Sequence, residues 1–241
     1  TNTEIAGVGT TGVGGLTTVA IGGLTTAGVR VLNSAQVSYI TTAQIGVLST
    51  AQVASISTAS ISGITTAQAQ VLSSTQVGAL TTAEVSALST VQLSNLTTVA
   101  VAGLTTAGVR VLSSTQVGGL TTAEASVLGT SQVAAISTAG VVGVTTVQAA
   151  VLSSVQVGAL TTANVNLLTT AQLSNLNTAG FSGLSTDQVR VLSATQVAGL
   201  NTAETVVLTS VQLAAITTSG VLGLTNTEIA GVGTTGVGGL T

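Results

Sequence analysis

The octapeptide TTAQIGVL at Thr41–Leu48 belongs to a pattern that runs through the whole chain. Related octads stand at Thr81–Leu88 (TTAEVSAL) and Ser153–Leu160 (SSVQVGAL). Cut every eight positions, the 241 residues give thirty octads and a final Thr241, and the eighth place is Leu, Ile or Val in all thirty. A short fixed period indicates a repeat architecture, in which each unit buries its apolar residues against neighbouring units.

Two polar places of the octad favour a short helix. The first place is Thr, Ser, Asn or Gly in every octad, and the fourth is Gln or Glu in nineteen. This spacing is typical of a capping box, and the preceding apolar residue is placed to pack on the fifth as a hydrophobic staple. Acids near the helix start and arginines near its end also suit the helix dipole. The place-four acids are Glu4, Glu84, Glu124, Glu204 and Glu228, and the place-six arginines are Arg30, Arg110 and Arg190.

The alternative fold is a two-sided β-solenoid with two octads in each coil. Val, Ile and Thr are abundant, and places three, five and seven are mostly apolar, the alternation of a half-buried strand. Glycine-rich octads such as Gly9–Leu16 are poor helix formers. A strand, however, would point Asp187 at place three inward and gives no reason for Gln or Glu at place four. The main prediction is therefore a mainly α solenoid of thirty short capped helices.

Longer periods overlie the octad. Similar octads return every forty residues, as at Ser73–Leu80 and Ser113–Leu120, and the closest matches return at eighty, which is also the spacing of the three arginines. If two octads form one coil, each octad of the pair lies on its own face of the solenoid. Forty residues are five octads, an odd number, so a shift of forty moves an octad to the other face. Eighty residues are ten octads, so a shift of eighty returns it to the same face. We therefore expect two octads per coil.

The two ends of the sequence share one segment. Residues Thr1–Thr17 reappear letter for letter as Thr225–Thr241, twenty-eight octads later. We therefore expect residues 1–241 to form a single continuous octapeptide-repeat solenoid, an excerpt of a longer array with a 224-residue super-repeat.

Packing inside such an array follows from the octad. We expect places three, five and eight to be buried, and the frequent Gly and Ala at places six and seven to let adjacent backbones approach closely. Tyr39 at place seven and Phe181 at place five are interpreted as local variants of the core. A helix of six or seven residues is unstable alone, so stacking must supply the stability.

The composition excludes most enzyme chemistry. The chain has three basic and six acidic residues, no His and no Cys, and its basic residues are all arginines. No group is available to activate a Ser or Thr nucleophile, form a Schiff base or complete a zinc site. The acids are scattered through the octads and form no pair suited to glycoside hydrolysis. We expect a non-catalytic protein with no catalytic, cofactor-binding or metal-binding residues and no small-molecule substrate.

Two classes of partner are also excluded. The mean hydropathy is +0.74, but Thr, Ser, Gln or Asn interrupts every apolar stretch well before the roughly 18 residues that a membrane span needs. The net charge is −3 and aromatic residues make up 1% of the chain, so neither phosphates nor bases have a binding surface. We expect no membrane span and no nucleic-acid partner.

The nine-residue segments Leu80–Leu88, Leu168–Leu176 and Leu184–Leu192 are close to the pattern LTTAQVxxL, each with one or two departures from it. This pattern resembles the long octapeptide arrays of very large bacterial proteins that are secreted or displayed on the cell surface. The resemblance implies a structural or adhesive role, and it carries no functional residues to transfer. We expect an extracellular or cell-surface protein that forms or decorates a filament, sheath or surface layer by self-association. The alternative is an adhesin stalk or an ice-binding solenoid that binds a ligand along its repeats.

Overall fold

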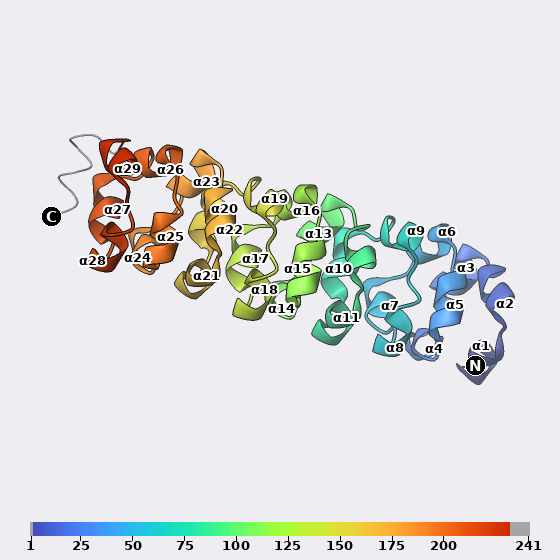
Figure 1. Ribbon diagram of the computed structural model, residues 1–241. Coiled ribbons are helices and arrows are strands. Elements are labelled where there is room, and N and C mark those ends of the chain that lie inside the picture. Colours follow the sequence, from blue (N-terminus) through green and yellow to red (C-terminus); the bar gives the residue numbers. More distant parts are fainter. Residues whose placement is uncertain (1, 232–241) are drawn as a thin grey trace. The chain divides into compact units, whose positions relative to one another are not determined.

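The computed structural model describes residues 2–231, which fall into two compact units, Thr1–Val127 and Leu128–Thr241. In each unit, short helices alternate with extended links (Figure 1). Residues 2–231 contain no strand, so the predicted mainly α solenoid is confirmed and the β-solenoid alternative is wrong. Whether residues 1–241 form one continuous solenoid stays a prediction.

Each octad within the described residues forms one helix of four to six residues. The helices of the first unit are α1 (Asn2–Gly7), α2 (Thr10–Gly14), α3 (Thr18–Gly22), α4 (Thr26–Arg30), α5 (Ser34–Tyr39), α6 (Thr42–Gly46), α7 (Thr50–Val53), α8 (Thr58–Ile61), α9 (Thr66–Ala69), α10 (Ser74–Ala79), α11 (Thr82–Ala87), α12 (Thr90–Leu93), α13 (Thr98–Ala102), α14 (Thr106–Arg110), α15 (Ser114–Gly119) and α16 (Thr122–Val127). Those of the second unit are α17 (Thr130–Ala135), α18 (Thr138–Val141), α19 (Thr146–Ala149), α20 (Ser154–Ala159), α21 (Thr162–Leu167), α22 (Thr170–Ser174), α23 (Thr178–Ser182), α24 (Thr186–Arg190), α25 (Ala194–Ala198), α26 (Thr202–Val206), α27 (Ser210–Ala215), α28 (Thr218–Val221) and α29 (Asn226–Gly231).

The start of each helix is fixed by the residue at place one. Thr41 has extended backbone angles, φ −71° and ψ 161°, and its hydroxyl accepts a hydrogen bond of 3.2 Å from the main-chain N–H of Gln44. Oε1 of Gln44 in turn accepts from the main-chain N–H of Thr41 at 2.7 Å. The predicted capping box is thereby confirmed. It satisfies two of the N–H groups that the first turn of a helix leaves without partners.

The end of each helix needs neither proline nor a left-handed glycine. Leu80 follows α10 in an extended conformation, φ −59° and ψ 133°, and its N–H donates to the carbonyl of Val77 at 3.2 Å. Thr81 after it is also extended and caps the next helix. Two extended residues, at places eight and one, therefore separate α10 from α11 and turn the chain. The link is longer after helices such as α7, which ends at Val53 while α8 begins at Thr58.

The buried residues of the octad are those at places four, five and eight. In α6 and its link, Gln44, Ile45 and Leu48 are at most 4% exposed. Places four and five are adjacent in the helix, and place eight, in the extended link that follows, is buried with them. Place three is exposed in every octad from residue 11 to residue 227, including the ones that carry Val91 and Val99. The prediction that place three is buried was therefore wrong, because a helix turns that place outward.

Helices that pack on one another lie three apart in the chain, as α10 packs on α13 and α20 on α23. Hydrogen bonds between coils join residues 28 apart, which is three and a half octads. The prediction of two octads per coil was therefore wrong: one coil takes between three and four. The physical reason is that two short helices cannot enclose a core, whereas three or four can surround the apolar residues of places five and eight.

Close backbone contacts recur at place seven with a forty-residue spacing. A Cβ atom on Gly103 would overlap the main-chain carbonyl of Ser74 in the preceding coil. Gly63, Gly183 and Gly223 stand in the same relation to main-chain carbonyls of the coil that precedes each of them. The predicted close approach is confirmed at place seven. These glycines account for part of the forty-residue period.

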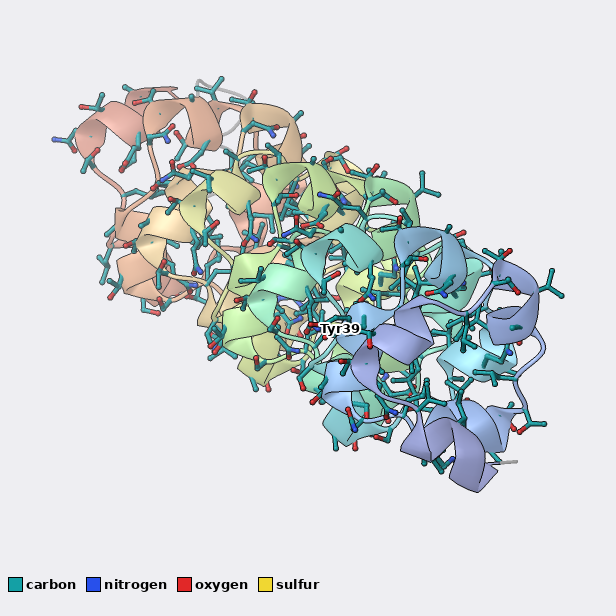
Figure 2. All side chains as sticks on the ribbon, turned by 90° about the vertical axis from the view of Figure 1, so that its right-hand side faces the viewer. Tyr39 is labelled. Atoms are coloured by element: carbon teal, nitrogen blue, oxygen red, sulfur yellow. The ribbon has the colours of Figure 1, made fainter. Side chains whose placement is uncertain are left out.

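The two aromatic residues lie in different environments. Phe181 at place five is fully buried, so its interpretation as a core variant is confirmed. Tyr39, labelled in Figure 2, is 52% exposed. Its interpretation as a core residue was wrong, because place seven, unlike place five, does not belong to the buried face of the helix.

The glycine contacts predict opposite outcomes for one substitution at two sites. We expect Gly103→Ala to lower the free energy of unfolding by about 3 kcal/mol, because the backbone of Ser74 leaves no room for a methyl group. We expect Gly46→Ala to raise it by about 0.5–1 kcal/mol, because nothing lies within 4 Å of a Cβ there and alanine favours the helix. Urea unfolding followed by circular dichroism measures both. Equal effects of the two substitutions would contradict the close approach at Gly103.

Candidate functional site

The fourth place of the octad carries the largest set of buried polar side chains. Its glutamines are between 1% and 7% exposed. Burying an amide costs free energy unless its hydrogen-bonding groups find partners. The buried place-four glutamines are Gln36, Gln44, Gln52, Gln68, Gln76, Gln92, Gln116, Gln132, Gln148, Gln156, Gln172, Gln188, Gln196 and Gln212.

Gln76 shows how the amide is satisfied at both of its ends. Oε1 accepts a hydrogen bond of 2.9 Å from the main-chain N–H of Ser73, at the start of its own helix. Nε2 donates to the carbonyls of Ile45 at 3.0 Å and Leu48 at 2.8 Å, at the end of a helix in the preceding coil. One side chain thus supplies the missing partners at the start of one helix and at the end of another.

We call this pair of contacts, from one amide to two coils, the amide bridge. Its Nε2 bond to the preceding coil recurs at a fixed offset of 28 residues, from place four to a place-eight carbonyl. It therefore ties successive coils together within each unit by a regular series of hydrogen bonds. The further pairs, each written with the Nε2 donor first, are Gln36 to Val8, Gln44 to Leu16, Gln52 to Leu24, Gln68 to Ile40, Gln92 to Ile64, Gln116 to Leu88, Gln156 to Leu128, Gln172 to Val144, Gln188 to Leu160, Gln196 to Leu168 and Gln212 to Leu184.

Smaller residues at place four use other means. The hydroxyl of Ser60 donates to the carbonyl of Leu32 at 2.7 Å, again 28 residues earlier. At Gly180 the coils approach so closely that a Cβ would lie 2.8 Å from the carbonyl oxygen of Leu152. The amide of Asn177, three residues before, donates to that carbonyl at 3.2 Å instead. The place-eight carbonyl thus finds a donor in both cases.

Ionised glutamate at place four can make only the acceptor half of these hydrogen bonds. The carboxylates of Glu84, Glu124 and Glu204 accept from the main-chain N–H at their helix starts at 2.6–2.7 Å. An ionised carboxylate has no hydrogen to donate to the preceding coil. Oε1 of Glu124 and Oε1 of Glu204 are buried and have no hydrogen-bond partner.

Burial raises the pKa of the carboxyl groups of Glu84, Glu124 and Glu204, because a charged carboxylate loses its hydration in the interior. The N–H donors at the helix starts oppose this effect in part. For Glu204 the neighbouring charge of Glu228 adds to burial, and the pKa rises from 4.5 to about 7. The folded state therefore binds protons more tightly than the unfolded state. The stability that this supplies is present below pH 4.5 and is lost as the pH rises through 7.

The outer surface offers little chemistry. Asp187 and Arg190 form an exposed ion pair at 2.6 Å, three residues apart on α24, and such pairs contribute little to stability. An open groove of about 650 Å³ lies between α10 and α13, and its polar side chains are the hydroxyls of Ser74, Thr75 and Thr98. No cluster of three or more potential metal ligands occurs within residues 2–231. Over the same residues, no helix has the length and apolar character that crossing a bilayer requires.

The chain matches the ALTTAQ repeat family three times, at residues 13–50, 85–122 and 165–202. The predicted octapeptide-repeat array is confirmed. All three ALTTAQ matches begin at place five and end at place two, so they share one octad register. No curated protein and no solved structure matches the chain.

Because the Gln76 amide bonds to two coils, replacing Gln76 should cost much more stability than replacing an exposed glutamine. Gln76→Met keeps an unbranched side chain of similar length but removes the donor to Leu48 and the acceptor for Ser73. We expect it to lower the free energy of unfolding by about 2–4 kcal/mol, because three main-chain groups each lose a hydrogen bond to the amide. The matched control is Gln70→Met, at an exposed position where the amide donates to the side chain of half-buried Asn95.

We expect the control to change the stability by less than about 0.5 kcal/mol. Hydrogen exchange measured by mass spectrometry would locate the loss. In Gln76→Met, protection should fall in the octads of Gln76 and Leu48, and unchanged protection there would rule out the bridge as a source of stability.

Proposed function

We propose that this ALTTAQ-repeat chain is a structural, non-catalytic array that forms or decorates an extracellular filament, sheath or surface layer by self-association. The observation that carries the proposal is the use of the buried polar groups. The place-four amides hold one coil to the next, as Gln76 and Gln188 do. The buried polar side chains thus serve assembly of the repeat, and the groove between α10 and α13 is lined without a charged side chain.

Self-association is supported by the apolar residues that the helices turn outward. Valines at place three are between 57% and 83% exposed. Single exposed valines are ordinary on a protein surface, so the support for self-association comes from their recurrence at one place of the octad, which offers a second copy the same apolar contact many times. These residues are Val19, Val91, Val99, Val147, Val155 and Val211.

The low charge supports the same proposal. The net charge is −3 over 241 residues, so electrostatic repulsion between copies is weak. The extracellular location rests on the resemblance to secreted octapeptide arrays. It agrees with the absence of Cys and Met, the residues most easily oxidised.

The alternative function, an adhesin stalk or ice-binding surface, requires a repeated polar face with free hydroxyl groups. The place-one hydroxyl oxygens of Thr41, Thr81 and Thr161 already accept hydrogen bonds from their own helices. The exposed valines at place three offer apolar contact to a second copy of the chain, which supports self-association.

Sedimentation velocity over a range of concentrations, with electron microscopy of the same samples, tests self-association. We expect the sedimenting mass to rise with concentration, and we expect it to rise less in a variant with serine at Val91, Val99, Val155 and Val211. The matched control has serine at four alanines that also occupy exposed place three. These are Ala43, Ala67, Ala83 and Ala163. An array that stays monomeric at the highest concentration would overturn the proposal.

A further inference from the structure

The glutamate-bearing octads differ from the glutamine-bearing octads in one hydrogen-bond donor. In Gln196, Nε2 donates to the carbonyls of Val165 at 3.0 Å and Leu168 at 2.7 Å. Glutamate has an oxygen in place of that nitrogen. When ionised, this oxygen cannot donate, and it would face carbonyl oxygens that also carry negative partial charge.

Glu204 occupies the same position as Gln196 in its octad. It is 1% exposed, and its carboxylate accepts at 2.7 Å from the main-chain N–H of Asn201. The carbonyls at the two offsets that the Gln196 amide uses belong, for Glu204, to Leu176 and Leu173. Its second oxygen is buried without a partner. Glu124 repeats this arrangement with 1% exposure and an unpartnered Oε1, and the corresponding carbonyls belong to Leu96 and Leu93.

We propose that Glu124 and Glu204 are proton-binding sites of the solenoid, where a proton on Oε1 donates to the carbonyls of the preceding coil as the glutamine amide does elsewhere. Release of the proton to solvent as the pH rises then breaks this bond. It leaves a buried charge against the carbonyls, so that the coils are held less tightly at these two octads.

The surroundings of the two groups offer no compensating positive charge. Glu204 lies on α26, which packs on α23 and α29. Neither α23 nor α22, which precedes the Leu176 carbonyl, carries a titratable side chain. The one charged group that α29 contributes is Glu228, whose negative charge further disfavours ionisation of Glu204. Within its own unit, Glu124 on α16 packs on α13, and neither α13 nor α12 carries a titratable side chain.

The direction and size of the effect follow from proton linkage. With a pKa of about 7 in the folded state against 4.5, Glu204 makes the folded state more stable at low pH. Full ionisation reduces the folding equilibrium constant by about 300-fold through this one group. The loss begins above pH 4.5 and is complete above pH 7.

Urea unfolding of the full chain between pH 4.5 and 8.5 tests this proposal at concentrations below any association, so its outcome is independent of the proposed assembly. We expect the midpoint of the natural sequence to fall as the pH rises. A double variant, Glu124→Gln and Glu204→Gln, should be more stable than the natural sequence at pH 8.5 and show a flatter profile. Asp187→Asn is the control, because that carboxyl is exposed and paired with Arg190, and it should leave the profile unchanged.

The reciprocal variant Gln196→Glu should acquire a new pH-dependent loss of stability while folding normally at pH 4.5. Infrared spectra at pH 6 should show the carbonyl stretch of a neutral carboxyl group in the natural sequence, and this band should weaken in the double variant. The proposal is overturned if the double variant keeps the natural pH profile or if Gln196→Glu gains none. It is also overturned if sodium or calcium restores the midpoint at pH 8.5, since the carboxylates would then bind a metal cation.

Discussion

The hydrogen bonds of one glutamine amide hold the repeat together. A helix of four to six residues has hardly any internal hydrogen bonds, and most of its main-chain groups need partners elsewhere. Gln76 supplies partners to two helices. Its Oε1 accepts from the main-chain N–H at the start of its own helix, and its Nε2 donates to the carbonyl that follows a helix one coil earlier. The stability of each helix is therefore inseparable from the stacking of coils, as expected for a solenoid whose units contact only near neighbours.

The rest of the octad follows from that constraint. The amide lies inside, and the apolar residues buried with it are the helical residue at place five and the link residue at place eight, which form the core. A core built mainly from Val, Leu and Ile, with a single buried Phe181, is narrow enough for three or four short helices to surround. Glycine at Gly103 and its counterparts then lets backbones meet where side chains would hold the coils apart.

Much of the local structure could be predicted from the sequence, because it depends on neighbouring residues. The octad frame, the capping box and the burial of places five and eight all follow from spacing along the chain. The number of octads per coil could not, because it depends on how helices three apart in the chain pack on one another. The coil-to-coil role of the amide was also missed, although one signal was present. A capping box accepts either Gln or Glu, yet fourteen of the nineteen residues are Gln, the one with a hydrogen to donate.

A coil of between three and four octads also affects how such a chain can change in length. In a solenoid whose repeat equals one full coil, loss of part of a repeat breaks the pattern of contacts. Here the offset of 28 residues joins place four to place eight whichever octads lie between them. Removing or adding any single octad therefore leaves each amide 28 residues after a place-eight carbonyl. The array can lengthen or shorten during evolution one octad at a time.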